Sequence, residues 1–316
     1  MRHLALTLLA VCSAAEAPAN GSFPVSIDDA RAADVIIETK PERIVALSNF
    51  GADMMVALGL TPIGITTYEG KRPVYLGPSL DGAADLGDLT APNLEILASL
   101  APDLTIGMLH YNGPFEKEIS EIGGFLAFDA GDLATSDENV TQLGRALGAS
   151  EVAAEMNAAF AELRRSIRER APQDGPEYLF LWHYYDTFYA YQDNLLTTEL
   201  ISSMGAENLA GYNDSVETAE QAFMPLDPEE LLKFDPEVLF VFTSHGGPVK
   251  ANPVFDRMAA VQNGKAFSMG YQYSQPSGPI AREMILLEAA HLLYPDLFDA
   301  PEMPDGARAR PLVFAE

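Results

Sequence analysis

Aromatic side chains gather at the ends of predicted strands in this sequence, where they could bind a bulky organic ligand. Ligand sites of α/β proteins usually form at the carboxyl ends of strands. A tyrosine or tryptophan ring combines an apolar face with a hydrogen-bonding edge, which suits a large molecule of mixed polarity. The aromatic residues at these positions are Tyr68, Tyr111, Trp182, Tyr184, Tyr185, Tyr271 and Tyr273. For Trp182, packing in the core is an equally good interpretation.

Three of the five histidines also follow predicted strands, where they could bind a metal. Imidazole is a common metal ligand, but these residues lack the close i, i+4 spacing of a helical metal site, so the indication is weak. They are His110, His183 and His245. Close to Tyr68 in the sequence, Lys71 and Arg72 could neutralise an anionic ligand, or they could be a solvated pair in a loop.

Motifs and composition argue against an enzyme and against a nucleic-acid-binding protein. The sequence has no G-x-S-x-G, no Walker loop, no H-E-x-x-H and no pair of cysteines. Its 46 acidic and 19 basic residues give a net charge of -27, which would repel a phosphate backbone. We therefore expect a protein that binds a small molecule, is not an enzyme and does not bind nucleic acid.

The element that must position these residues is one long amphipathic helix, predicted over residues 151–171. Ser150 is a suitable N-cap, Pro172 a suitable stop, and neither glycine nor proline interrupts the helix. Apolar residues recur on one face at helical spacing. At about 1.5 Å per residue the helix would reach on the order of 30 Å. Because it lies near the middle of the chain, it could join two halves.

The two halves resemble each other at a constant offset of 134 residues. Residues 94–106 have the pattern of a helix, a turn of proline followed by an acid, and a strand, and residues 228–240 repeat it. The same offset places the apolar run 44–47 on 178–181. This repetition predicts a duplicated α/β lobe on each side of the long helix.

The predicted organisation has five parts. The N-terminus combines Arg2 and His3, an apolar run over residues 4–11 and small residues after it, which is the plan of a secretory signal. Cys12 is the only cysteine, and bulky Val11 before it disfavours a lipid anchor there. The parts are a signal peptide (1–19), an N-terminal lobe (24–149), a connecting helix (150–172), a C-terminal lobe (173–298) and a loosely attached tail (299–316).

Several segments together resemble one protein family over residues 41–297. They are R-I-V-A-L-S from Arg43, G-L-T-P-I-G-I from Gly59, L-G-D-L-T-A-P-N-L-E-I-L-A-S-L-A-P-D-L from Leu86 and E-L-L-K-F-D-P-E-V-L-F-V from Glu230. Their order resembles that of the periplasmic substrate-binding proteins of ABC importers for ferric siderophores, haem and cobalamin. The resemblance implies an α/β fold with two similar lobes, one long central helix and a ligand cleft between the lobes.

The resemblance also implies a ligand and a partner. A ferric siderophore is the expected ligand, with iron(III) as part of the chelate and no permanently bound cofactor. The alternatives are a haem or cobalamin receptor of the same fold, or a carrier of metal or oxyanion. Hydroxamate-binding relatives have a chelate-binding arginine near Leu89, and none stands here. In this family Tyr111 and Tyr273 fall where aromatic residues often contact the ligand, and histidine or tyrosine could complete the coordination of iron.

One acid in each repeat matches the residues that dock such proteins on their permease in the inner membrane. They are Glu95 and Glu229, and matched charges on two lobes would suit a two-fold permease. The alternative is that each simply favours the dipole in the first turn of its helix. The resemblance further implies a monomer in the periplasm.

Overall fold

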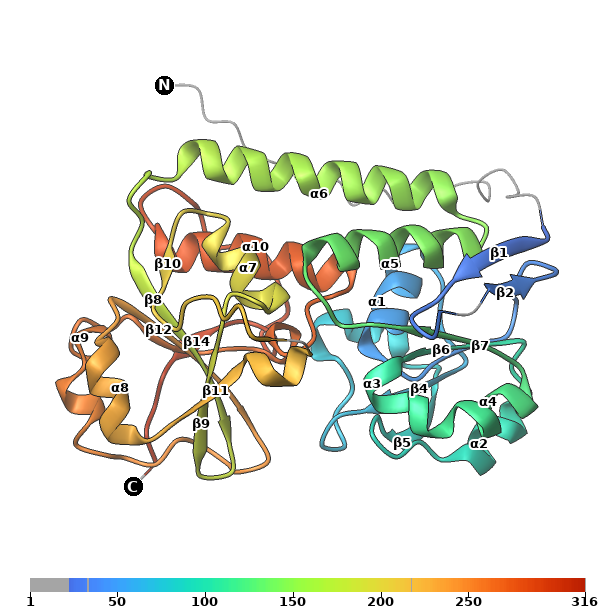
Figure 1. Cartoon of the computed structure of the whole chain (residues 1–316), viewed down its shortest axis with the longest axis horizontal. Helices are drawn as coiled ribbons and strands as arrows, with labels where there is room; N and C mark the ends of the chain where they lie inside the picture. Colours follow the sequence, from blue (N-terminus) through green and yellow to red (C-terminus); the bar gives the residue numbers. More distant parts are fainter. Residues whose placement is uncertain (1–22, 33, 217, 316) are drawn as a thin grey trace.

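The computed structural model describes residues 23–32, 34–216 and 218–315, so the predicted signal peptide and Cys12 lie outside the described residues. Two α/β lobes lie side by side beneath helix α6 (Ser150–Arg170), which crosses above both of them (Figure 1). The helix begins one residue earlier than expected, with Ala149 rather than Ser150 as its N-cap. The predicted two-lobed α/β fold with one long connecting helix is confirmed. Within the described ranges, no helix combines the length and apolarity needed to cross a membrane.

The N-terminal lobe is built on a five-stranded parallel sheet with the order β5-β4-β3-β6-β7. A two-stranded hairpin, β1 (Val25–Asp28) and β2 (Asp34–Ile37), precedes it. The strands of the sheet are β3 (Ile44–Ala46), β4 (Gly64–Thr67), β5 (Ala84–Asp88), β6 (Leu104–Met108) and β7 (Gly124–Phe128). The helices are α1 (Asn49–Ala57), α2 (Leu94–Leu100), α3 (Leu109–Asn112), α4 (Glu116–Ile122) and α5 (Leu133–Ala146), with 3-10 turns η1 (Val74–Leu80) and η2 (Gly113–Phe115).

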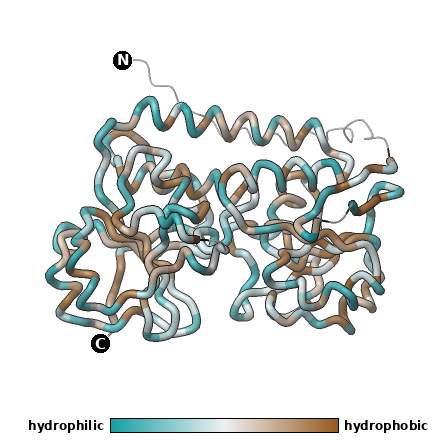
Figure 2. Tube along the Cα trace, in the orientation of Figure 1, coloured by the Kyte–Doolittle hydropathy of each residue, from teal (hydrophilic) through white to brown (hydrophobic). Residues whose placement is uncertain are grey.

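The C-terminal lobe is built on a mixed sheet with the order β11-β9-β8-β12-β13-β14, and β10 pairs with β8. Its strands are β8 (Glu177–Tyr184), β9 (Thr187–Tyr191), β10 (Glu207–Asn208), β11 (Phe223–Leu226), β12 (Val238–Ser244), β13 (Ala266–Ser268) and β14 (Arg310–Pro311). Its helices are α7 (Leu196–Ser202), α8 (Pro228–Phe234), α9 (Ala259–Gln262) and α10 (Pro279–Leu293), with 3-10 turns η3 (Ala219–Ala222), η4 (Phe255–Arg257) and η5 (Tyr271–Tyr273). Figure 2 shows hydrophobic residues concentrated in the strands of both lobes, as expected for sheets covered by helices.

The predicted repeat is visible in the register of the two sheets. Ile44 of β3 pairs with Leu104 of β6, and Tyr178 of β8 pairs with Val238 of β12, at the offset of 134 residues seen in the sequence. Helices α2 and α8 occupy matching positions and have seven residues each. Both are followed by a C-cap residue with left-handed backbone, Ala101 after α2 and Asp235 after α8.

The lobes differ on the other side of these strands. From β3 the chain crosses through α1 to β4, which is parallel, whereas from β8 it turns directly into the antiparallel strand β9. Alternating residues around 182–191 predict a hairpin at this point, and the antiparallel pairing of β8 with β9 confirms it. Residues 67–92, expected to be a loop, also contain η1 and β5. Gly70 and Gly82 lie at turns, whereas Gly77 and Pro78 lie within η1 and Gly87 within β5.

Helix α5 begins before the position that the sequence suggested. A capping box of Thr135 and Glu138 was the expected start, but the helix starts at Leu133, with Asp132 as its N-cap. The Asp132 carboxylate accepts the Thr135 amide at 2.9 Å and the Thr135 hydroxyl at 2.8 Å. These bonds hold the pKa of Asp132 below its usual value.

The C-terminal strap, residues 303–315, packs against both lobes, so the expectation of a loosely attached tail is wrong. Ala307 is 1% exposed and belongs to a core cluster that includes Leu76 and Leu80 of the N-terminal lobe. The chain then returns to the C-terminal lobe, where β14 pairs with β13. The strap ends with the amide of Ala315 bonded to the Val249 carbonyl at 2.8 Å.

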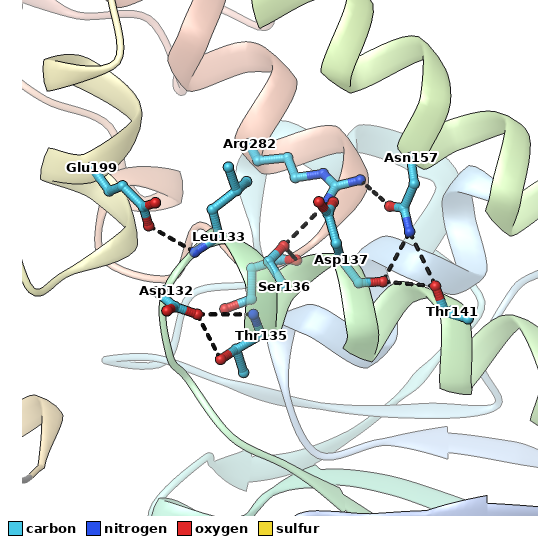
Figure 3. A network of polar contacts seen from close by, with 10 residues as sticks. Asp132, Leu133, Thr135, Ser136, Asp137, Thr141, Asn157, Glu199 and Arg282 are labelled. Atoms are coloured by element: carbon cyan, nitrogen blue, oxygen red, sulfur yellow. Dashed lines mark hydrogen bonds and ion pairs between the residues drawn. The ribbon is translucent and has the colours of Figure 1, made fainter.

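A buried polar joint locks the two lobes together beneath α6 (Figure 3). Arg282 of α10 is fully buried and donates to Asp137 of α5 at 2.7 Å and to Asn157 of α6 at 2.6 Å. Its guanidinium also lies 4.3 Å from the centre of the Phe160 ring. One side chain from the C-terminal lobe thus ties a helix of the N-terminal lobe to the connecting helix.

Each lobe also places a carboxylate at the start of a helix of the other lobe. Asp53 of α1 accepts the amides of Ile280 and Ala281 at 2.8 and 2.9 Å, at the N-terminus of α10. Glu199 of α7 accepts the amide of Leu133 at 2.7 Å, at the N-terminus of α5 (Figure 3). Because helix N-termini carry unpaired amides and partial positive charge, both contacts stabilise the observed arrangement of the lobes.

Candidate ligand cleft between the lobes

A cleft of about 760 Å³ lies between the lobes, within the size range of small-molecule sites. The N-terminal lobe contributes Glu69 and Lys71, from the turn that follows β4. The C-terminal lobe contributes residues 243–249 after β12, Ser268 of β13, and residues 310–313 of the C-terminal strap. The cleft therefore has walls from both lobes, at the carboxyl ends of the central strands.

An aromatic cluster reaches this cleft through His245, the member of the cluster that lines it, and connects the lobes. Tyr68 of the N-terminal lobe stacks on Tyr271 of the C-terminal lobe, with ring centres 4.9 Å apart. Tyr68 also meets the edge of His245 at 5.1 Å, and its hydroxyl lies 3.2 Å from the His245 Nδ1. The predicted residues Tyr68, Tyr271 and His245, which are far apart in the sequence, are thus in direct contact.

The strand β8 extends the aromatic cluster within the C-terminal lobe. Trp182 contacts Tyr184 with ring centres 4.8 Å apart, and Tyr184 contacts both Tyr185 at 4.7 Å and His245 at 5.2 Å. The indole nitrogen of Trp182 donates to Ser244 at 2.8 Å, and Ser244 itself lines the cleft. Five of the eight predicted ligand-binding residues therefore belong to one continuous set of rings with His245.

Unusual backbone conformations coincide with the cleft. Six non-glycine residues in the described ranges have positive φ, and two of them, Ala101 and Asp235, are the matching helix ends. Another three lie at the cleft: Glu69 at 51°, Tyr185 at 52° and His245 at 57°. Such residues are often found at functional sites, where the surrounding fold holds them against a conformational cost of order 1–3 kcal/mol each.

A second polar contact between the lobes involves the same histidine. The Glu69 carboxylate accepts the backbone amide of His245, and its Oε1 lies 3.4 Å from the ring Nδ1. Burial raises the pKa of Tyr68 to about 12, so its hydroxyl is neutral at physiological pH. The neutral phenol can donate a hydrogen bond to a ligand oxygen. The sequence analysis did not single out Glu69.

Three of the predicted site residues are engaged elsewhere. Tyr273 is fully buried, stacks on Phe180 and donates to Glu288 at 3.1 Å, so it is a core residue and not a wall of the cleft. The Arg72 guanidinium donates to the carbonyls of Leu80 and Ala83, and so holds η1 in place. The third, His183, lies on the opposite face of β8.

The alternation of side chains along β8 explains the position of His183. Trp182 and Tyr184 lie on one face of β8, with Tyr184 against His245, so His183 between them lies on the opposite face. It is 4% exposed and stacks on Phe188 with ring centres 4.9 Å apart. Burial lowers its pKa below the usual value. Among the residues that the structure describes, no three histidine, cysteine or acidic side chains gather as a metal site would require.

His110 and Tyr111 lie together in α3 at the end of β6. Their rings meet at 71° with centres 4.7 Å apart, and His110 is exposed whereas Tyr111 is half-buried. Neither is among the residues that line the cleft. The offset repeat aligns Tyr111 with His245, and the two residues follow the matching strands β6 and β12. Their ligand roles stay predictions.

The matched acids Glu95 and Glu229 are exposed at the second positions of α2 and α8. Neither forms an ion pair within the described part of the chain. Figure 1 places α2 and α8 at the outer ends of the two lobes, on the side of the molecule opposite α6. The two helices that carry these acids therefore lie on the same side of the molecule, one in each lobe.

Comparison with known proteins finds a family and several relatives. The family described as periplasmic binding protein matches residues 44–273. The Fe(3+)-citrate-binding protein YfmC of Bacillus subtilis is 25% identical over 279 residues, which cover 84% of this chain and 85% of that protein.

Solved structures share the fold. The triscatecholate siderophore binding protein FeuA from Bacillus subtilis, in complex with ferri-bacillibactin, has a TM-score of 0.71 and 19% identity, and the match covers 85% of this chain and 98% of that chain. IsdE of S. aureus, in complex with heme, has a TM-score of 0.63 and 19% identity, and the match covers 80% of this chain and 98% of that chain. Both similarities establish the shared two-lobed architecture.

Proposed function

Because this chain belongs to the periplasmic binding protein family, we propose that it is the extracytoplasmic receptor of an ABC importer and that it carries an iron(III) chelate, such as a ferric siderophore. The observation that carries this proposal is the aromatic cluster from both lobes at the edge of a cleft of about 760 Å³. The iron-citrate specificity of the YfmC relative supports a ferric chelate as the ligand.

The chelate itself would supply most of the coordination of iron. The described side chains do not converge as a metal site, and Tyr68 is a neutral phenol, so the cleft is suited to the outer surface of a chelate. Its rings would cover the apolar parts of the ligand, and hydroxyl groups would meet its oxygen atoms. On this proposal iron is cargo, and the receptor binds it without a chemical step.

Haem is a second candidate ligand because of one contact in the cleft. The hydroxyl of Tyr68 and the Nδ1 of His245 lie 3.2 Å apart, and phenolate and imidazole are the two kinds of side chain that could ligate haem iron here. Binding of haem would require Tyr68 to lose its proton or His245 to turn toward the iron.

Delivery requires contact with the permease, and we assign this role to Glu95 and Glu229. Support comes from their matching positions on α2 and α8, their exposure and their placement on one side of the molecule. Carboxylates in such an arrangement would pair with arginines of a two-fold permease. The receptor would act as a monomer in the periplasm after export by the segment 1–19.

The ligand can be tested by fluorescence because Trp182 is the only tryptophan of the chain and contacts the aromatic cluster. Protein made in iron-free medium would be titrated with ferric citrate, a ferric hydroxamate, a ferric catecholate, haem and cobalamin. We expect saturable quenching by a ferric chelate and none by its iron-free form. A Soret shift with haem would favour the second candidate. Absence of quenching and of retained iron with every ferric chelate would contradict the proposal.

A further inference from the structure

We propose that the C-terminal strap is a wall of the ligand cleft and that its Arg310, together with Lys71 of the opposite lobe, selects ferric chelates that carry free carboxylates. This inference rests on the proposed function and adds to it the charge of the ligand. It also assigns a role to a segment that lies beyond the family match at residues 44–273.

The strap is held firmly enough to shape a binding site. Gln272 is fully buried and donates from Nε2 to the Ala307 carbonyl at 2.7 Å. The amide of Ala309 donates to the Glu288 carboxylate at 2.7 Å, and the amide of Leu312 donates to the Ala266 carbonyl at 2.9 Å. These bonds lie on both sides of Arg310, so its backbone is fixed at the edge of the sheet.

Lys71 is held in a comparable way on the opposite lobe. Its amide donates to the Tyr68 carbonyl at 2.9 Å, and its carbonyl accepts the Tyr68 amide at 3.0 Å. This tight turn projects from the end of β4, next to the aromatic cluster. Lys71 and Arg310 therefore approach one cleft from two lobes, each from a hydrogen-bonded backbone.

Both cations are exposed to the cleft and have no carboxylate partner among the described residues. Arg310 donates from Nη2 only to the Asp305 carbonyl, at 3.2 Å. Glu69 is the one carboxylate among the residues that line the cleft, and it already accepts the amide of His245. The cleft thus has more basic than acidic side chains, in a protein with 46 acids and 19 bases.

This reversal of charge favours an anion at the cleft. An anionic ligand would be repelled by most of the surface, and two cations concentrated in one cleft would attract and orient it. The planar guanidinium of Arg310 can bind a carboxylate through two hydrogen bonds, and the ammonium of Lys71 can bind another. A chelate with several carboxylates could contact both lobes at once, whereas a neutral ferric hydroxamate would gain nothing from either cation.

The test compares an anionic with a neutral ferric chelate. Arg310→Gln, Lys71→Gln and the double variant would be titrated with ferric citrate and with ferrichrome, a neutral ferric trihydroxamate, using Trp182 fluorescence and equilibrium dialysis of iron. Lys117→Gln is the matched control, because Lys117 is an exposed lysine of α4 outside the cleft. We expect the unchanged protein to prefer ferric citrate, and each cleft variant to weaken it about fivefold, as for an exposed ion pair.

Binding of ferrichrome, where measurable, should be unchanged in every variant, and the ferric citrate affinity of the unchanged protein should fall with added salt more steeply than that of the double variant. Ferric chelate binding that is as tight in the double variant as in the control would overturn this inference and leave the proposed function intact. Failure of the unchanged protein to bind any ferric chelate would overturn both.

Discussion

The two lobes match on one side of their sheets and differ on the other. On the matching side, β3 with β6 and β8 with β12 keep the same register, and α2 and α8 have the same length and are each followed by a left-handed C-cap residue. On the other side, one lobe has parallel strands with η1 and the other has an antiparallel hairpin. Helices α2 and α8 of the matching side carry Glu95 and Glu229, whereas the cleft combines the chain after β12 with two segments that the repeat does not match, the turn after β4 and the C-terminal strap.

This difference separates two tasks. A partner with two-fold symmetry is best met by two equivalent surfaces, so the repeated α2 and α8 suit docking. A chelate has no such symmetry, and its cleft combines a turn of the N-terminal lobe with residues 243–249 and the C-terminal strap, and the aromatic residues of β8 reach it through His245. The lobes meet at the joint of Arg282, Asp53 and Glu199, where each lobe supplies hydrogen-bond partners to polar groups of the other.

The largest loss of stability should come from Arg282→Ala, which removes the side chain that joins both lobes and α6. Arg282 is fully buried but the side chain of its partner Asp137 is 41% exposed, so the loss should lie at the lower end of the about 3–5 kcal/mol that breaking a buried ion pair costs, and Asn157 also loses its hydrogen bond. We expect the free energy of unfolding in urea to fall by about 3 kcal/mol. The control Arg165→Ala removes an exposed ion pair with Glu162 and should cost less than about 1 kcal/mol. Equal losses of stability in the two variants would show that Arg282 contributes no more to the free energy of unfolding than the exposed ion pair of Arg165.

A pH dependence should follow from Asp53, which the N-terminal lobe places against α10. Burial raises its pKa from 3.8 to about 7, against the lowering effect of the Ile280 and Ala281 amides. The folded state binds this proton more tightly than the unfolded state does. The stability that proton binding to Asp53 adds to the folded state is therefore complete below about pH 4 and is lost as the pH rises through 7.

We therefore expect the free energy of unfolding to decrease between pH 4 and pH 7, relative to Asp53→Asn, by about 2–3 kcal/mol. Denaturant titrations of both proteins at several pH values would measure it. Parallel curves for the two proteins would contradict the assignment of this titration to Asp53.

A smaller effect at the same joint should come from Gly278→Ala. A Cβ at this position would lie 2.2 Å from the Asp53 Cγ, so the carboxylate would have to move away from the amides that it accepts. We expect a loss of about 2 kcal/mol in the free energy of unfolding, as for an overpacked core. Gly82→Ala is the control, because nothing lies within 4 Å of a Cβ there. A stability loss no larger than that of the control would mean that the joint is not closely packed.

The last expected effect concerns the matching side of the lobes. Reversing both docking charges, in Glu95→Arg with Glu229→Arg, should lower iron uptake by cells at least about tenfold, or about 1.4 kcal/mol, through repulsion of the permease arginines. Each single reversal should lower it less. The controls are Glu155→Arg with Glu169→Arg, exposed acids of α6 on the opposite side. Unchanged uptake, with unchanged chelate affinity, would refute the docking assignment.

Much of the fold could be predicted from local sequence signals. Helices α2 and α8 lie where the repeated segments 94–106 and 228–240 predicted them, because the Pro-acid turn that follows each helix marks its end. The repeat gave the correct register because its apolar strands pair centrally in both lobes. The C-terminal strap was not predicted, since its attachment depends on distant partners such as Gln272 and Glu288.

The site was predicted less completely than the fold. Strand ends suggested Tyr68, Trp182 and His245, and the structure brings them into one cluster, in which Tyr68 contacts His245 and Trp182 is linked to His245 through Tyr184. The sequence could not distinguish cleft from core for Tyr273, because a short 3-10 turn decides which way its ring points. The sequence analysis grouped His183 with the site residues, but side chains alternate along β8 and His183 lies on the face opposite Trp182 and Tyr184. Arg310 lies in a segment whose sequence has no recognisable secondary-structure pattern.

The most direct test of a ferric chelate in the interlobe cleft is the anomalous scattering of iron in crystals grown with the chelate that quenches Trp182. We expect one strong peak, inside the cleft between Lys71 and Arg310 and beside the rings of Tyr68 and Tyr271. An iron peak outside this cleft, or chelate density that contacts only one lobe, would contradict the account.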